Sequence, residues 1–212
     1  MEVSKSFQKH VGKAFLMLLA FALLGLAACT KKELPQPVEE TPQIWVKAKI
    51  DGVPVEMAAG EGVSYATTIK HNIDSNLTEF VFKINALDNE HGLQITFIDS
   101  FNNFGTIEEQ LAHSITTGGY KFAYTSSWPF KLNANEIIVI YNDYRHSEEY
   151  YSLYSPQPQW AKFEIQSVKD VIFEGKPFRM AQVAFSCKIR DPFTGWTYTI
   201  TDGTASIPFG QR

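Results

Sequence analysis

The stretch WVKAKIDGVPVEM, residues 45–57, decides the fold class of this chain. Apolar and charged side chains alternate along its first half, where Val46, Ala48 and Ile50 are separated by Lys47 and Lys49. An alternation of period two predicts a β-strand with one buried and one solvated face. Asp51 and Gly52 are the residue types that the tight turn of a β-hairpin favours. We therefore expect the folded part of the chain to begin with a β-hairpin.

The same alternation continues through the rest of the chain. It recurs in the segments 80–86, 93–99, 120–124, 160–165 and 196–200. The segment EIIVIY, residues 136–141, is apolar on both faces, which predicts a central strand that is covered twice. Near the C-terminus, Gly203 precedes a further alternating run, residues 205–209. This region fits either a tight hairpin or one long strand with a bulge at Gly203.

About ten short strands at this spacing, in a chain with 14% aromatic residues, predict an all-β fold. We expect two packed antiparallel sheets, a β-sandwich of the jelly-roll or immunoglobulin-like kind, in one domain spanning residues 44–212. One short helix is expected after Thr106, because Thr106 and Glu109 have the spacing of a capping box. Ile107 and Leu111 then share the apolar face of that helix.

Residues 1–28 have the features of a signal peptide. Lys5, Lys9 and Lys13 form a basic start, and an uncharged apolar run, residues 14–28, follows them. That run is too short for a comfortable membrane span, which needs ~20 residues. We therefore expect this segment to be removed from the mature protein.

The apolar run ends in Leu26-Ala27-Ala28-Cys29, which resembles the lipobox of bacterial lipoproteins. The resemblance implies that the Cys29 thiol carries diacylglycerol through a thioether and that its freed amine takes a further acyl chain. Two or three acyl chains anchor a protein stably, whereas a single chain does not. The alternatives are a plain secretory peptide with an incidental cysteine, or an uncleaved short anchor.

Residues 29–43 comprise the lipidated Cys29 and the segment TKKELPQPVEETPQ, which is rich in proline and charge. That composition is typical of a disordered tether. Thr30 stands where enteric lipoproteins retained in the inner membrane have Asp, so the resemblance implies delivery to the outer membrane. Both the periplasmic face and the cell surface remain open as locations.

The chain has 19 basic and 23 acidic residues and a formal net charge of −4. Residues 1–28 contain three of the basic residues and Glu2, so the mature protein keeps 16 basic and 22 acidic residues, a net charge of −6. A mildly acidic protein lacks the electrostatic footprint of a nucleic-acid or anionic-lipid binder. We expect no nucleic-acid partner, and we expect membrane association through the lipid on Cys29.

Both ends of the mature chain resemble the small β-sandwich lipoproteins common in Bacteroidetes. The resemblance rests on the lipobox, the tether, the opening KAKIDGVPVEM (residues 47–57) and the closing VAFSCKIRDPFTGWTYTITDGTASIPF (residues 183–209). It leaves roughly residues 60–160 without a counterpart. Met180-Ala181-Gln182 replaces a glycine expected in that family, and Ala205 stands where Phe is usual. Because most members have no known function, the resemblance implies fold and location rather than an activity.

The residues that could carry chemistry give no catalytic or metal-binding pattern. Cys187 shares a strand face with Val183 and Phe185, which predicts a buried small hydrophobe rather than a nucleophile. The histidines after residue 28 have no paired-ligand spacing; they are His71, His91, His113 and His146. G-x-S-x-G and a glycine-rich phosphate loop are absent from the sequence. We expect no metal, no cofactor and no catalytic residue.

The segment YNDYRHSEEYYSLYSPQPQW, residues 141–160, contains five of the nine tyrosines. Exposed Tyr and Trp rings suit stacking on sugar rings or contact with a partner protein. The candidate ligand-binding residues are Tyr144, Tyr150, Tyr151, Tyr154 and Trp160. The alternative is a long hairpin whose tyrosines pack over the edge of the fold. Trp128, Pro129 and Phe130 form a second candidate surface.

We therefore expect a lipid-anchored envelope protein that acts as a non-enzymatic binding or interaction module. Its expected ligand is a glycan or an envelope protein. Two alternatives remain open. One is a hydrolase built on paired carboxylates, which the 22 acidic residues permit without any fixed spacing. The other is a structural subunit of an envelope complex, which would carry a broad exposed apolar patch.

Overall fold

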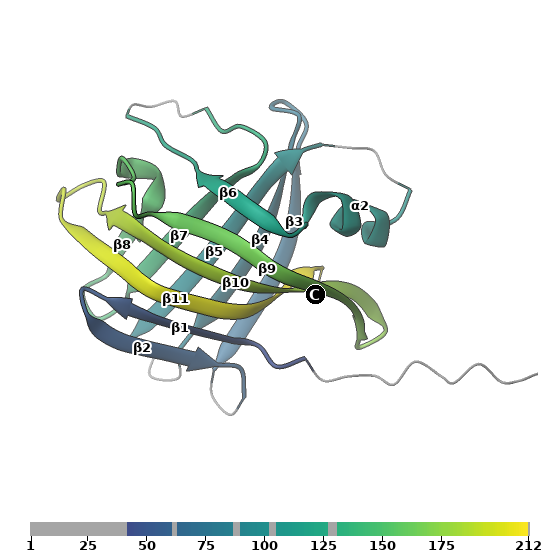
Figure 1. Cartoon of the computed structure of the whole chain (residues 1–212), viewed down its shortest axis with the longest axis horizontal. Coiled ribbons are helices and arrows are strands. Elements are labelled where there is room, and N and C mark those ends of the chain that lie inside the picture. The colour runs from purple at the N-terminus through teal and green to yellow at the C-terminus, as the bar shows by residue number, and fades with distance from the viewer. Residues whose placement is uncertain (1–41, 61–62, 87–89, 102–104, 127–130, 212) are drawn as a thin grey trace, which may run out of the picture. The chain divides into compact units, whose positions relative to one another are not determined.

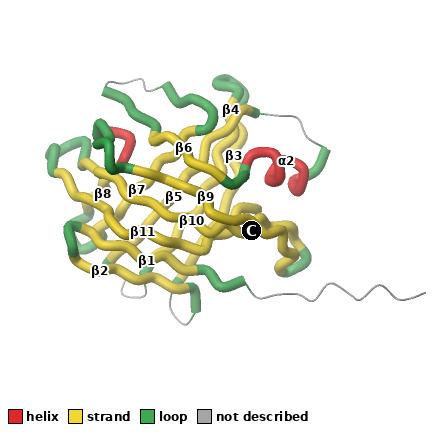
Figure 2. The backbone as a smooth tube through the Cα atoms, viewed as in Figure 1, coloured by secondary structure: helices red, strands yellow, loops and turns green. Residues whose placement is uncertain are grey.

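The computed structural model describes residues 42–60, 63–86, 90–101, 105–126 and 131–211, which belong to one compact unit. The strands and helices are β1 (Trp45–Ile50), β2 (Val53–Ala58), β3 (Ser64–Asn72), β4 (Leu77–Asn85), β5 (His91–Ser100), α2 (Ile107–Ser114), β6 (Gly118–Phe122), β7 (Glu136–Asp143), β8 (Glu148–Tyr151), η1 (Ser152–Tyr154, a 3-10 turn), β9 (Lys162–Phe173), β10 (Lys176–Arg190) and β11 (Thr197–Gly210). Figures 1 and 2 show their arrangement.

Several predictions from the sequence fall outside the described residues. The expected signal peptide, Cys29 and the tether up to residue 41 lie there, and so do Trp128, Pro129 and Phe130. In the part of the chain that the structure does describe, no helix has the length and apolar character needed to cross a membrane.

The strands form a single 11-stranded sheet. Its order is β2-β1-β11-β10-β9-β6-β7-β5-β4-β3, and β8 pairs with both β7 and β10. Among the described strands, β6 and β7 pair in parallel and the other pairs are antiparallel. The all-β class predicted from the sequence is confirmed.

The two expected sheets are two halves of this one sheet. One half contains β2, β1, β11, β10 and β9, and the other contains β7, β5, β4 and β3. The halves cross face to face in Figure 1, and β11 lies close to β3 and β4. β6 joins them because it pairs with β9 at its beginning and with β7 at its end. The twist of a long sheet lets its two ends face each other in this way.

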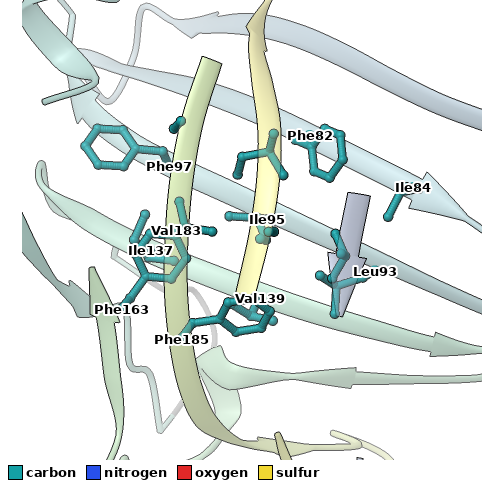
Figure 3. Packing of buried hydrophobic residues seen from close by; sticks show 14 of the residues in the cluster. Phe82, Ile84, Leu93, Ile95, Phe97, Ile137, Val139, Phe163, Val183 and Phe185 are labelled. Carbon is teal, nitrogen blue, oxygen red and sulfur yellow. The ribbon is translucent and has the colours of Figure 1, made fainter. Parts of the chain in front are cut away.

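The inner faces of the two halves form the main hydrophobic core (Figure 3). One half contributes Phe82, Ile84, Leu93, Ile95, Phe97, Ile137 and Val139, and the other contributes Phe163, Val183 and Phe185. Cys187 is also completely buried in this core, and burial raises the pKa of its thiol. The predicted role of Cys187 as a buried small hydrophobe is confirmed.

β7 is the central strand that its apolar sequence predicts. Ile137 and Val139 face the main core. Ile138 faces the other way and packs in a second cluster with Ile98, Ala123 and Leu153. The strand is therefore covered on both faces, as the sequence of residues 136–141 indicates.

Of the two possible hairpin turns that glycines mark in the sequence, one is present and the other is a bulge. Asp51 and Gly52 join β1 to β2 with φ of 47° and 82°, the two positive values that a type I′ hairpin turn needs. At the C-terminus, β11 is one long strand. Gly203 lies opposite Phe185, whereas Ile200 lies opposite Cys187, so β11 contains one extra residue between these pairs. The structure thus decides for a bulge over a second hairpin.

α2 closes one end of the core. Its capping box is present as predicted: Glu109 N donates to Thr106 Oγ1 and Thr106 N donates to Glu109 Oε2, both at 3.2 Å. Leu111 and Ile115 are buried in the main core. Arg179 Nε on β10 donates to the Ile115 carbonyl at 2.6 Å and holds the end of the helix in place. The opposite end, which we call the open end, carries the turns 51–52 and 144–147 and the loop 191–196.

Candidate ligand-binding pocket

The structure does not bring the five candidate residues of the Tyr-rich segment together. Tyr150 is fully buried in the main core, so its ring has no face for a ligand. Tyr151 and Tyr154 pack against each other at 5.4 Å beside the second cluster, on the opposite face of the sheet. Trp160 is 47% exposed just before β9, at a position of the same parity as the solvent-facing Lys162. The alternative to a ligand-binding surface, in which the tyrosines of this segment pack over the fold, therefore holds for Tyr150, Tyr151 and Tyr154.

Tyr144 lies on the outer face of β4 and β5. Its hydroxyl donates to Asn85 Oδ1 at 3.0 Å, and Lys83 Nζ lies 5.8 Å from its ring centroid. The ring covers Gly92, where an added Cβ would come within 3.0 Å of the Tyr144 hydroxyl and within 2.7 Å of Asn85 Oδ1. Gly92 therefore leaves room for this ring, and Tyr144 is a packing residue of the β7–β8 turn.

A pocket of about 480 Å³ lies at the open end, between the β1–β2 hairpin and the inner face of the opposite half of the sheet. It is lined by Ile50, Asp51, Val53, Pro54, Val55, Glu56, Ala86, His91, Tyr141, Asp143, Arg145 and Tyr198. The set combines apolar walls with aromatic rings and a few polar groups, which is the usual make-up of a ligand site. We take this pocket as the candidate functional site.

A row of aromatic rings forms one side of the pocket and continues into the core. His91 and Tyr141 stack with centroids 5.8 Å apart, and the Tyr141 hydroxyl lies 2.7 Å from His91 Nδ1. Tyr141 contacts Tyr150 at 6.4 Å, and Tyr150 contacts Tyr198 at 4.4 Å. Residues two apart on a strand share a face, so β5, β7, β8 and β11 place these rings side by side.

Tyr150 lies between Tyr141 and Tyr198 in this row and contacts both rings. Burial raises the pKa of its phenol, and hydrogen bonds with Glu148 and Tyr198 raise it further. The hydroxyl therefore stays protonated and donates to Glu148. Since Tyr150 has no exposed surface, its part in the site is to hold Tyr141 and Tyr198 in position.

Asp143 is the buried carboxylate of the pocket. It accepts hydrogen bonds from Arg145 N at 3.2 Å and Arg145 Nε at 3.4 Å, and His146 Nδ1 lies 3.0 Å from its other oxygen. Burial tends to raise the pKa of Asp143, but the hydrogen bonds to His146 and Arg145 outweigh it and keep this pKa below the ordinary value of 3.8. Arg145 also pairs with Glu90 at 3.5 Å. Asp143 is therefore an ionised acceptor at neutral pH, held in place by Arg145 and His146.

The other charged residues of the pocket wall are also paired. Asp51 Oδ1 accepts from Thr199 N at 2.6 Å and from the Thr199 hydroxyl at 2.9 Å. Glu56 pairs with Lys47 at 2.8 Å. Every charged side chain that lines the pocket thus has a protein partner, and the lining contains three carboxylates and one guanidinium beside its aromatic faces.

Asp143 and Glu148 are the two carboxylates that the alternative of a carboxylate-pair hydrolase would use at this pocket. They are direct register partners of β7 and β8, and their side chains share the inner face. A glycosidase general acid needs a raised pKa, whereas the pKa of Asp143 is lowered. Glu148 accepts the hydroxyl of Tyr150. Asp143 therefore does not have the raised pKa that the acid of such a hydrolase requires. Within the described residues, no three His, Cys, Asp or Glu side chains are grouped so as to hold a metal ion.

The segment 141–160, which the sequence singles out, contains only some of the residues that line this pocket. Tyr141, Asp143 and Arg145 lie in the segment 141–160 that the sequence singles out. His91, Tyr198 and Val53 come from three distant strands, and nothing local marks them. These residues could be predicted only from the pairing of β5 with β7 and of β11 with β1. That pairing brings the ends of these strands together at the open end.

Comparison with known proteins found no family model that matches this chain, no matching curated protein and no matching solved structure. The function is therefore argued from the residues of the pocket themselves.

Proposed function

We propose that this protein is a lipid-anchored bacterial envelope protein whose β-domain binds a ligand in the pocket at the open end without transforming it chemically. The observation that carries this proposal is the pocket itself, with apolar walls, stacked His91 and Tyr141, and the fixed carboxylate of Asp143. A few polar groups among apolar and aromatic ones orient a ligand, while the rigid strands hold the site in shape. The ligand is a glycan or an envelope protein segment.

β1 runs from near the start of the described chain towards the pocket at the open end. Trp45, at the start of β1, pairs with Ser206, whereas Ile50 pairs with Ile200 next to the open end. The pocket therefore lies beyond the far end of β1, ~17 Å along the strand from Trp45.

A pocket-blocking variant tests the binding site. Val53 lines the pocket and is 63% exposed, so Val53→Trp fills the space without disturbing the core. Ile73→Trp is the matched control, because Ile73 is 84% exposed in the turn between β3 and β4, at the other end of the sheet. Full-length protein in a detergent without sugar groups is probed with a glycan array and with envelope extract. We expect Val53→Trp to lose ligands that Ile73→Trp retains.

Equal retention by the two variants would show that ligands bind elsewhere and would contradict the proposed site. Turnover of a bound glycan by the native protein would favour the hydrolase alternative. For the anchor, Cys29→Ser is expected to move the protein from the membrane fraction to the soluble fraction of the cell. Unchanged membrane association of Cys29→Ser would contradict lipidation at this residue.

A further inference from the structure

The loop between β10 and β11 lies at the open end, on the left of Figure 1, and carries two exposed aromatic residues. Phe193 is 96% exposed and Trp196 is 64% exposed. Asp191, in contrast, is buried, and its carboxylate accepts from Phe193 N at 2.7 Å and from the Thr194 hydroxyl at 2.6 Å. The hydrogen bond from the Thr194 hydroxyl lowers the pKa of Asp191, and backbone hydrogen bonds lower it further, whereas burial opposes them. The pKa is lowered overall, so Asp191 stays ionised.

Two backbone hydrogen bonds also hold this loop. Gly195 N donates to the Asp191 carbonyl at 3.0 Å, and Asp191 N donates to the Trp196 carbonyl at 2.9 Å. Gly195 has a φ of +79° and lies under Arg190, whose Nη2 would be 3.2 Å from an added Cβ. The loop is thus held by its polar groups, and its aromatic rings contribute little to its own packing. Exposed aromatic rings on an ordered loop mark an interaction surface.

Trp196 is close in the chain to Tyr198, the last ring of the aromatic row of the pocket. The bond from Asp191 to Trp196 extends the β10–β11 ladder by one residue beyond the pair of Arg190 and Thr197. Trp196 directly precedes β11 and lies two residues from Tyr198, ~7 Å along the chain. Tyr198 lines the pocket and Trp196 is 64% exposed, so an exposed tryptophan lies two residues away from a lining residue.

The pairing of the pocket charges indicates which ligand fits. Asp51, Glu56 and Asp143 outnumber Arg145 in the pocket wall, so an anionic ligand is disfavoured, and each of the three carboxylates already has a protein partner. A neutral sugar keeps these pairs, since its hydroxyl groups can share the remaining lone pairs and its apolar ring faces can stack on aromatic side chains.

We propose that the pocket and Trp196 are adjoining subsites for an uncharged oligosaccharide. One sugar ring lies in the pocket beside Tyr141 and Tyr198, and a following ring stacks on Trp196. This inference rests on the proposed function, since it names the ligand class of the same pocket. It gives a role to the ordered loop, in which the Asp191 carboxylate binds Phe193 N and the Thr194 hydroxyl and the Asp191 backbone N–H donates to the Trp196 carbonyl.

The test uses neutral oligosaccharides of graded length. Full-length protein, in a detergent without sugar groups, is titrated with malto-, cello- and manno-oligosaccharides from the monosaccharide to the hexasaccharide. We expect affinity to rise with length in at least one series. Trp196→Ala should weaken binding of the longer members about tenfold and leave the monosaccharide unchanged, because only the second ring loses its stacking partner. Trp196→Phe should restore most of the affinity.

Trp160→Ala is the matched control, because Trp160 is also a partly exposed tryptophan but lies in the turn before β9, outside the pocket lining. If Trp196→Ala behaves like Trp160→Ala while Val53→Trp abolishes binding, the pocket stands and the second subsite is wrong. If Val53→Trp also binds normally, the proposed function itself is wrong. If no series binds and an envelope protein is captured through Trp196 instead, the assignment of a sugar is overturned.

Discussion

Gly203 shows how one residue constrains the core at the residue scale. It lies opposite Phe185 in the β10–β11 pair, at the bulge of β11. A Cβ at this position would come within 2.5 Å of the Phe185 carbonyl oxygen and 2.9 Å of its ring. Since Phe185 is packed in the main core, neither atom can move away cheaply.

Gly203→Ala is therefore expected to lower the free energy of unfolding by about 1–3 kcal/mol through overpacking. Gly60→Ala is the control, because an added Cβ at Gly60 meets no atom within 4 Å. The control should change stability by less than about 0.5 kcal/mol. Denaturant unfolding of both variants measures the difference, and equal stabilities would contradict the close approach at Gly203.

Asp143 gives the fold a pH-dependent contribution. Its folded-state pKa lies below the ordinary value of 3.8, so its contribution is fully present above that value and is lost as the pH falls through the folded-state pKa. Asp143→Asn should cost about 1–3 kcal/mol at pH 7 and progressively less at acidic pH. Unfolding measured at pH 7 and at pH 3 tests this. A cost that stays the same at both values would show that the carboxylate charge contributes nothing.

At the scale of elements, the sequence predicts the strands well because each strand has one face in the core. Phe80, Phe82 and Ile84 of β4 are buried, as are Leu93, Ile95 and Phe97 of β5. The Asp51-Gly52 turn and the Thr106–Glu109 cap depend only on residues within a few positions of one another. Both are found as predicted. The pairing of β6 with β7 in parallel has no such local pattern.

The capping box makes α2 a sensitive element. Thr106→Ala removes the side-chain acceptor of Glu109 N and should lower the free energy of unfolding by about 1 kcal/mol. Thr117→Ala, an exposed threonine just after the helix, is the matched control. Thermal unfolding followed by circular dichroism compares them. Equal midpoints would show that the helix end is not coupled to the stability of the core.

At the scale of the whole molecule, the first and last described strands are neighbours. β1 pairs with β11, with Trp45 opposite Ser206, so residue 44 and the end of β11 lie on the same side of the sheet. Gly210 lies four residues beyond Ser206, ~14 Å along the strand. A flexible linker of about six Gly and Ser residues spans this distance.

A circular permutant tests this arrangement. The permutant joins residue 211 to residue 44 through such a linker and opens the chain in the exposed turn 73–76, between β3 and β4. We expect it to unfold cooperatively, like the unpermuted segment 44–211, because every strand pair is kept. Circular dichroism with denaturant unfolding measures this. A permutant without cooperative unfolding would contradict the pairing of β1 with β11.

The candidate site was harder to predict than the fold. The tyrosine-rich segment drew attention to residues 141–160, and Tyr141, Asp143 and Arg145 do line the pocket. Composition could not tell which of its rings face inward, and Tyr150, proposed as a ligand contact, is instead buried beneath the pocket. His91 and Tyr198 contribute because strands far apart in the chain end at the same place.

The sequence by itself determined the all-β class, the strand faces, the β1–β2 turn and the cap of α2, because each depends on residues within a few positions of one another. Only the tertiary structure decided that the strands form one sheet folded onto itself and that its open end holds a pocket. The order of strands depends on contacts between distant segments, which period-two alternation does not encode. For the same reason, the place of Tyr198 in the pocket, beside Tyr141 and Ile50, depends on the pairing of β11 with β10 and β1.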